Sequence, residues 1–167
     1  DGFLAEICRA WEAATAPAEA AGVRVVHLRT GLVLSPEGGV LKPLLTPFKL
    51  GLGGRLGTGR QYWSWITIDD AVAGIIHAIE HDSVGGALNL TAPEPAPQLM
   101  FAKALGHALH RPTVLPTPKF AVQARLGKEA AAEMTLAGQR AIPAKLESTG
   151  YRFLHPQLGE ALDTLLA

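Results

Sequence analysis

The stretch VRVVHLRTGLVL, residues 23–34, decides the fold class. It is short and rich in β-branched residues, a composition typical of a parallel strand that helices cover on both faces. The preceding segment, residues 3–21, is rich in Ala and Glu and spaces its apolar residues for one helical face. Gly22 suits the C-terminal end of that helix. A helix followed by a buried strand predicts an α/β fold.

Alternation of helices and strands continues along the chain. A second strand is expected at residues 87–91, in the same parallel sheet as residues 23–29. Between them, residues 63–68 predict another strand, and residues 71–81 predict a helix. Four residues of that helix are expected on its buried side: Val72, Ile75, Ile76 and Ile79. The other predicted elements are helices at 41–50, 97–109, 118–126, 128–136 and 156–166 and a short strand at 113–115.

Composition limits the possible partners. The 167 residues suit one domain, and a hydrophobic content of 48% can build a core. The formal net charge is zero and the isoelectric point is about 7.2, so no general attraction to nucleic acid or to an acidic membrane is expected. The single cysteine, Cys8, excludes an internal disulfide framework. A single cysteine fits a reducing compartment, and no run of residues approaches the length of a membrane span or shows a signal-peptide pattern, so a cytoplasmic protein is expected.

The stretch LGLGGRLGTG, residues 50–59, resembles a dinucleotide-binding loop but stands in the wrong context. Such a loop follows a strand and opens a helix, whereas this one follows a helix and leads into a strand. We therefore expect residues 48–65 to line the mouth of a substrate cleft. The alternative is a surface linker whose aromatic residues fill the core. The side chains expected to bind substrate are Arg55, Arg60, Gln61 and Trp63.

The helix at residues 71–81 also carries a short metal-binding pattern. His77, Glu80 and His81 match H-x-x-E-H, which places two imidazoles on one helix face beside a carboxylate. The three side chains fall opposite Ile75 and Ile79, on the side expected to face water. We therefore expect no metal site.

Five segments together resemble a known family. They cover nearly the whole chain in order, and they are FLAEICRAWE (3–12), LRTGLVLSPEGG (28–39), PFKLGLGGRLGTGRQYWSWITIDD (47–70), FAKALGHALHRP (101–112) and GQRAIPAKLESTGYRF (138–153). The chain resembles the C-terminal part of an atypical extended short-chain dehydrogenase/reductase. That family belongs to the NAD(P)-dependent epimerase/dehydratase superfamily, and the resemblance is to an epimerase-like, cell-division inhibitor-like subfamily with a distinctive C-terminal domain.

The resemblance implies the C-terminal portion of a Rossmann-type fold with a mainly helical substrate-side lobe. Residues 1–36 would be the last helix and strand of the nucleotide-binding half, residues 37–111 the substrate-loop region with a returning Rossmann strand and helices, and residues 112–167 the helical lobe. The family's N-terminal Gly-rich βαβ half has no counterpart in this chain. The resemblance implies NADP or NAD as the cofactor of the full-length protein. Because the half that grips the dinucleotide is absent here, we expect weak or absent binding by this chain alone.

The resemblance also assigns residues to the cofactor. Gly31, Leu32 and Val33 match the segment that lies against the nicotinamide end. For Val33 the alternative is a residue of the strand core, because buried strands are rich in valine. The superfamily's usual catalytic Tyr and Lys fall on Leu4 and Cys8 when Glu12 is aligned with its downstream glutamate. Neither residue can perform that general acid/base chemistry, so the catalytic residues are unknown.

Two classes of function follow from the resemblance. The first is the substrate-side part of an NAD(P)-dependent epimerase/dehydratase-like oxidoreductase that acts on a nucleotide-sugar or a related small molecule. The second is a catalytically degenerate cofactor-binding protein with a regulatory or interaction role. Sugar-nucleotide epimerases place an arginine just before the strand that matches residues 65–68, and Trp63 falls at about that position. A homodimer is the expected assembly.

Overall fold

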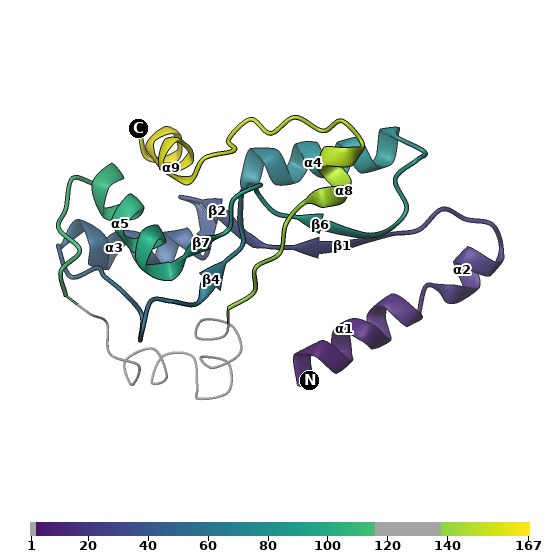
Figure 1. Cartoon of the computed structure of the whole chain (residues 1–167), viewed down its shortest axis with the longest axis horizontal. Coiled ribbons are helices and arrows are strands. Elements are labelled where there is room, and N and C mark those ends of the chain that lie inside the picture. Colours follow the sequence, from purple (N-terminus) through teal and green to yellow (C-terminus); the bar gives the residue numbers. More distant parts are fainter. Residues whose placement is uncertain (1–2, 116–137) are drawn as a thin grey trace.

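The computed structural model describes residues 3–115 and 138–167 (Figure 1). The helices predicted at 118–126 and 128–136 lie outside these ranges. The elements run in the order α1 (Phe3–Ala13), α2 (Ala16–Ala20), β1 (Val26–Thr30), β2 (Leu32–Ser35), β3 (Gly38–Gly39), α3 (Leu41–Lys49), β4 (Tyr62–Trp63), β5 (Trp65–Thr67), α4 (Ile68–Glu80), β6 (Gly86–Leu90), β7 (Ala96–Pro97), α5 (Gln98–Ala108), α8 (Ala144–Ser148) and α9 (Leu158–Leu166).

Three small sheets organise the described strands. β1 pairs with β6 in parallel, from Val26 opposite Gly86 to Thr30 opposite Leu90. β2 lies between β3, which is antiparallel to it, and β5, which is parallel to it. The third sheet joins β4 and β7 in antiparallel fashion. The α/β class is confirmed, and so is the expectation that the strands near residues 23–29 and 87–91 share one parallel sheet.

Three predicted elements are corrected by the structure. The helix expected over residues 3–21 is two helices, because Pro17 has no N–H and in a continuous helix its ring would clash with the carbonyl of Ala13, where α1 ends. The strand expected over residues 63–68 is divided at Ser64, since β4 pairs with β7 whereas β5 pairs with β2. Residues 113–115 form no regular strand.

The buried face of α4 also differs from the prediction. Val72, Ile76 and Ile79 were expected to be buried, but their exposed fractions are 49%, 48% and 67%. Small residues face the sheet instead, namely Ala71, Gly74 and Ala78. A Cβ atom added at Gly74 would lie 2.9 Å from Cδ2 of Leu90. The helix therefore packs closely on β6 through its smallest side chains, which leaves its larger apolar residues outside.

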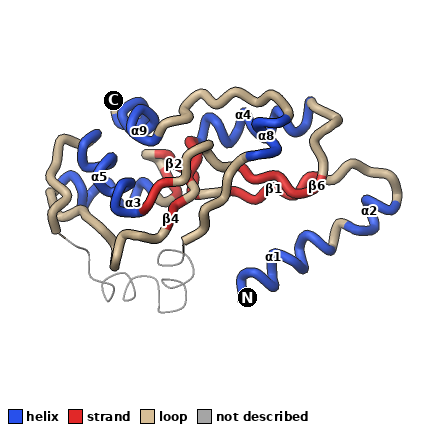
Figure 2. Tube along the Cα trace, viewed as in Figure 1, coloured by secondary structure: helices blue, strands red, loops and turns tan. Residues whose placement is uncertain are grey.

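Two hydrophobic clusters hold the elements together. The larger contains Leu34 of β2, Phe48 of α3, Trp65 of β5, Phe101 of α5 and Leu162 of α9 among its buried residues. The smaller lies under α4 and α8 against β6. Figure 2 shows this division, with α3, α5 and α9 gathered at one end and α4 and α8 beside the β1–β6 pair. No helix within residues 3–115 and 138–167 has the length and apolar content needed to cross a bilayer.

Candidate functional site

The parallel strands β1 and β6 end side by side, at Thr30 and Leu90. Ligands of open α/β sheets bind outside the carboxyl ends of the strands, so this edge is the first place to look for a site. Gly31 follows β1 directly, and its backbone N–H donates to the carbonyl of Leu90 at 2.9 Å. The N–H of Leu32 donates to the carbonyl of Ser64 at 2.7 Å. The chain thus passes at Gly31 from the sheet of β1 and β6 into the sheet of β3, β2 and β5.

Packing at this turn requires glycine. A Cβ atom added at Gly31 would lie 2.5 Å from the backbone oxygen of Ser64 and 3.0 Å from Cγ2 of Thr91. The backbone oxygen cannot move without breaking its hydrogen bond from Leu32. Thr91 is itself buried, and its hydroxyl has no hydrogen-bond partner among the described residues. The turn is therefore a tightly packed backbone wall at the carboxyl edge of β1.

Leu32 and Val33 point their half-buried side chains into different clusters. Leu32 packs against the larger cluster, and Val33 packs against the smaller one. Both the cofactor-wall and the strand-core interpretations are compatible with a half-buried Val33.

The Gly-rich loop between α3 and β4 is fixed at Leu56. The N–H of Leu56 donates to Oε1 of Gln98 at 2.8 Å, and its carbonyl accepts from Nε2 of Gln61 at 3.0 Å. Gln61 thus anchors the loop. Arg55 and Arg60, by contrast, are exposed, and each extends from the loop toward solvent.

Trp63 differs from the other residues expected to bind substrate because it is part of the core. Its exposed fraction is 4%, and its ring packs edge-on against Phe101 with the centroids 4.9 Å apart. Its indole N–H is buried and has no hydrogen-bond partner among the described residues. Buried polar groups without a partner are uncommon in folded proteins, and such a donor is available to a ligand or an ordered water.

A segment from the C-terminal part of the chain lies against β4. The hydroxyl of Ser64 accepts from the N–H of Ala141 at 2.9 Å and donates to the carbonyl of Gln139 at 2.8 Å. The guanidinium of Arg140 lies over the ring of Tyr62, 5.4 Å from its centroid. Sequence reasoning did not predict this contact, because 75 residues separate Ser64 from Gln139. The one available signal was a serine between two tryptophans in a segment predicted as a strand.

Asp70 connects α4 to residues 151–155. The helix cap is Thr67, whose hydroxyl accepts from the N–H of Asp70 at 3.2 Å. The buried Asp70 carboxylate accepts from the hydroxyl of Tyr151 at 2.9 Å and from the N–H groups of Leu154 and His155 at 2.8 and 2.9 Å. Burial raises the pKa of Tyr151 above its ordinary value, and the hydrogen bond to Asp70 acts in the same direction.

His77, expected to face water, is half-buried instead. Its Nε2 atom lies 3.0 Å from the hydroxyl of Thr149, and its ring stacks on His81 at 3.8 Å. Burial lowers the pKa of His77, and the neighbouring His81 lowers it further.

In the part of the chain that the structure describes, no set of three or more His, Cys, Asp or Glu side chains is placed to hold a metal ion. Cys8, at one of the positions that match the family's catalytic pair, is exposed on α1.

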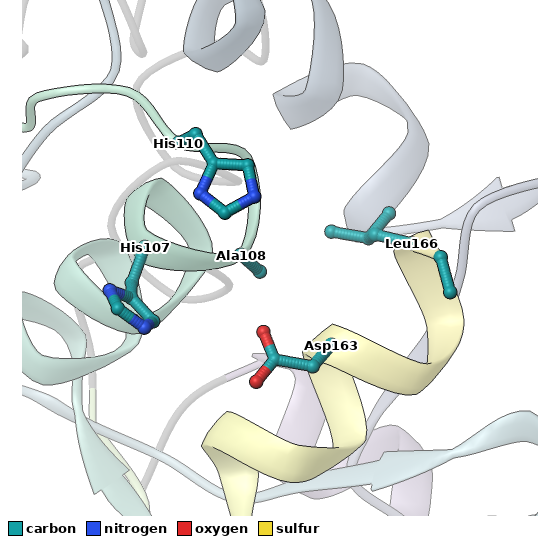
Figure 3. A pocket seen from close by; sticks show the side chains of 6 residues that line it. His107, Ala108, His110, Asp163 and Leu166 are labelled. Carbon is teal, nitrogen blue, oxygen red and sulfur yellow. The ribbon is translucent and has the colours of Figure 1, made fainter.

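Two concave surfaces lie elsewhere. One, of about 380 Å³, is lined by His107 and His110 at the end of α5 and by Asp163 and Leu166 of α9. Figure 3 shows the Asp163 carboxylate facing the two imidazoles across an open space. The other, of about 340 Å³, is a mainly apolar groove between β1 and α4, lined by Arg24, Val26, Leu28, Ile75, Ala78 and Ile79.

Comparison with known proteins gives a consistent result. A family model described as a domain of unknown function, DUF1731, matches residues 117–165. An epimerase family protein of Mycobacterium leprae (strain TN) is 52% identical over 161 residues, which is 96% of this chain and 52% of that protein. The chain spans about half the length of the relatives it matches.

Two solved structures are similar over most of the chain. One is human epimerase family protein SDR39U1 (isoform 2) with NADPH, with a TM-score of 0.82 and 42% identity, covering 86% of this chain and 48% of that one. The other is the nucleoside-diphosphate sugar epimerase from Corynebacterium glutamicum, with a TM-score of 0.79 and 37% identity, covering 99% of this chain and 31% of that one.

Parallel strands that end beside a glycine turn, covered by helices, define a Rossmann-type α/β protein. Sequence and structural similarity then connect the chain to the proteins named epimerase family protein. It corresponds to about half of their length, and the similarities support an atypical NAD(P)-dependent epimerase-like family member.

Proposed function

We propose that this chain is the substrate-side part of an NAD(P)-dependent, epimerase-like oxidoreductase. The observation that carries the proposal is the Gly31–Leu32 turn at the carboxyl edge of β1, in a fold shared with a relative crystallised with NADPH. The nicotinamide end of NADP or NAD would lie against Gly31, Leu32 and Val33. A close backbone wall without a projecting side chain suits a flat ring.

The substrate would lie between this turn and the loop that precedes β4. Arg55 and Arg60 are exposed there, Gln61 anchors the loop, and Trp63 offers a buried indole N–H without a partner among the described residues. Arginine binds phosphate through two parallel hydrogen bonds, which favours a nucleotide-sugar or a related anionic small molecule. The name of the Corynebacterium glutamicum relative, a nucleoside-diphosphate sugar epimerase, supports the same substrate class.

A second candidate is a cofactor-binding regulatory protein without catalytic activity. The positions that match the family's catalytic tyrosine and lysine hold Leu4 and Cys8. Neither side chain can act as the usual acid/base pair. Under this alternative the cofactor wall is retained, but bound substrate is not converted.

The test uses the full-length protein. NADPH is titrated by calorimetry, and a library of nucleotide-sugars is then screened by thermal shift in the presence of NADPH, because a true ligand raises the melting temperature by mass action. Ligands that stabilise the protein are incubated with it, and the sugar is analysed by NMR for a changed configuration or oxidation state. Conversion supports the enzyme, whereas binding of NADPH with no converted ligand supports the regulatory alternative. Absence of NADPH binding would contradict both.

A further inference from the structure

We propose that Arg140, held over the ring of Tyr62, binds a phosphate group of the substrate. The inference rests on the proposed function, because it names the residue that would hold the anionic part of the substrate. Arg140 is not among the residues that the sequence assigned to a site. It reaches the candidate site only through the folding of residues 138–142 against β4.

The backbone brings Arg140 to this position by a close approach. A Cβ atom added at Gly138 would lie 2.6 Å from the backbone nitrogen of Tyr62 and 2.9 Å from Cα of Gln61. Only glycine permits that approach without a shift of either backbone. Figure 1 shows the segment that leads into α8 running alongside β4.

Hydrogen bonds on both sides of Arg140 then hold the segment. Ser64 bonds to the carbonyl of Gln139 and to the N–H of Ala141 through its hydroxyl. Asn89 of β6 donates to the carbonyl of Ile142 at 3.0 Å. The residues around Arg140 are therefore fixed at two places, to Ser64 between β4 and β5 and to Asn89 of β6. A side chain presented from a fixed backbone loses less conformational entropy when it binds a ligand.

The guanidinium itself is available for a ligand. It lies over the Tyr62 ring, and no acceptor or carboxylate among the described residues forms a hydrogen bond or an ion pair with it. Arg29, in contrast, is engaged by the Glu12 carboxylate through two of its nitrogens at 2.7 and 2.8 Å. The cation–π attraction of the ring helps to orient the guanidinium, and its N–H donors stay available to a phosphate.

Two further guanidinium groups come from the adjoining loop. Arg60 directly precedes Gln61, against which Gly138 packs. A Cβ atom added at Gly59 would lie 3.3 Å from the Cβ atom of Arg55, so Arg55 lies at the same end of the loop as Arg60. Neither side chain forms an ion pair with a carboxylate in the described part of the chain. Cations on these neighbouring segments, without counterions among the described residues, would favour a ligand with more than one negative charge.

Ser64 also relates this position to the turn after β1. Its backbone carbonyl accepts from the N–H of Leu32, while its hydroxyl holds the residues on both sides of Arg140. One residue thus contacts the proposed cofactor wall and the proposed phosphate-binding segment. A phosphate on Arg140 would place the remainder of the substrate close to Gly31 and Leu32, where the nicotinamide is proposed to lie.

The experiment uses the full-length protein saturated with NADPH, with UDP and inorganic pyrophosphate as calorimetric probes. Arg140→Gln should weaken the binding of UDP and pyrophosphate by about tenfold or more, because a charged hydrogen-bond donor is lost. Arg140→Lys should restore only part of the affinity, because lysine lacks the bidentate geometry. The matched control is Arg152→Gln, which removes an equal charge from an exposed position and should leave both affinities unchanged.

A second pair of variants tests the close approach of Gly138 to the backbone of Gln61 and Tyr62. Gly138→Ala should weaken the binding of both probes while the affinity for NADPH stays at the wild-type value. Gly159→Ala is the matched control, since a Cβ atom there meets nothing within 4 Å and the residue lies in α9. Wild-type affinity of Arg140→Gln for both probes, or failure of the wild-type protein to bind either of them, would overturn the inference. NADPH binding in that same experiment would leave the proposed function standing, whereas its absence would contradict the proposed function itself.

Discussion

Asp70 of α4 accepts a hydrogen bond from the hydroxyl of Tyr151 at 2.9 Å, across 81 residues of sequence. The same carboxylate also accepts from the backbone N–H groups of Leu154 and His155, so one buried side chain holds residues 151–155 against α4. Asp70→Asn should lower the free energy of unfolding by about 2 kcal/mol or more, because an amide nitrogen would face donors that need an acceptor. Urea denaturation of the full-length protein measures the loss.

The adjacent exposed residue supplies a control for that substitution. Asp69→Asn makes the same chemical change one position earlier, on the solvent side of α4. It should change the free energy of unfolding by less than about 0.5 kcal/mol. Equal losses for both variants would show that the charge of the helix N-terminus, rather than the contact with Tyr151, is responsible.

Gly31→Ala tests the packed turn at the carboxyl edge of β1. The added Cβ atom would lie 2.5 Å from the Ser64 backbone oxygen, so the turn must shift. We expect weaker NADPH binding and a lower melting temperature in the full-length protein. Gly38→Ala is the control, because nothing lies within 4 Å of its added Cβ atom. Unchanged binding and stability for Gly31→Ala would mean that neither NADPH binding nor folding requires the tightly packed turn at Gly31.

The environment of His77 predicts a pH dependence of stability. Its pKa is lowered in the folded protein, first by burial and then by His81, so the unfolded chain binds more protons between the two pKa values. Stability should therefore fall as the pH drops from the ordinary value of about 6.5 through the lowered folded value. His77→Gln should flatten this slope in melting-temperature measurements between about pH 7.5 and pH 5. The same slope in the variant would contradict the prediction.

The exposed apolar residues of α4 lead to a further prediction. Ile79 lines the apolar groove against β1, and Ile76, about one turn earlier on the same helix, is also exposed. Exposed apolar surface of this kind commonly marks an interface. We expect the remainder of the full-length protein to cover it. Ile76→Ser should then cost about 1–2 kcal/mol of unfolding free energy in the full-length protein. Met100→Ser on α5, at a similar exposed fraction, should cost little. Equal costs would count against a covered face.

The sequence predicted the parallel pair of β1 and β6 because buried parallel strands have a recognisable composition. It failed on α4 because periodicity locates an apolar stripe but does not show how near the helix approaches the sheet. Gly74 allows a separation at which larger residues such as Val72 and Ile76 cannot fit between the helix and the sheet. Local spacing is insufficient to predict packing of this kind.

Residues of the candidate site were predictable only in segments that carry the family resemblance or a recognisable local pattern. Gly31 and the loop arginines stand in recognisable segments, whereas Ser64 and Arg140 meet only through tertiary contacts. Trp63 shows the opposite case, since its place beside the Gly-rich loop suggested a substrate-binding side chain but the ring is buried against Phe101. The division of the chain at residues 36 and 111 and the homodimer stay predictions.

A crystal structure of the full-length protein with NADPH tests the central claim most directly. The account predicts that the nicotinamide ring lies in van der Waals contact with the backbone of Gly31 and Leu32 and beside Val33. It also predicts that Arg60 and Arg140 face the open side of that ring, where a substrate would enter. A nicotinamide bound away from residues 31–33, or a cofactor that occupies the region around Arg140 itself, would contradict the account.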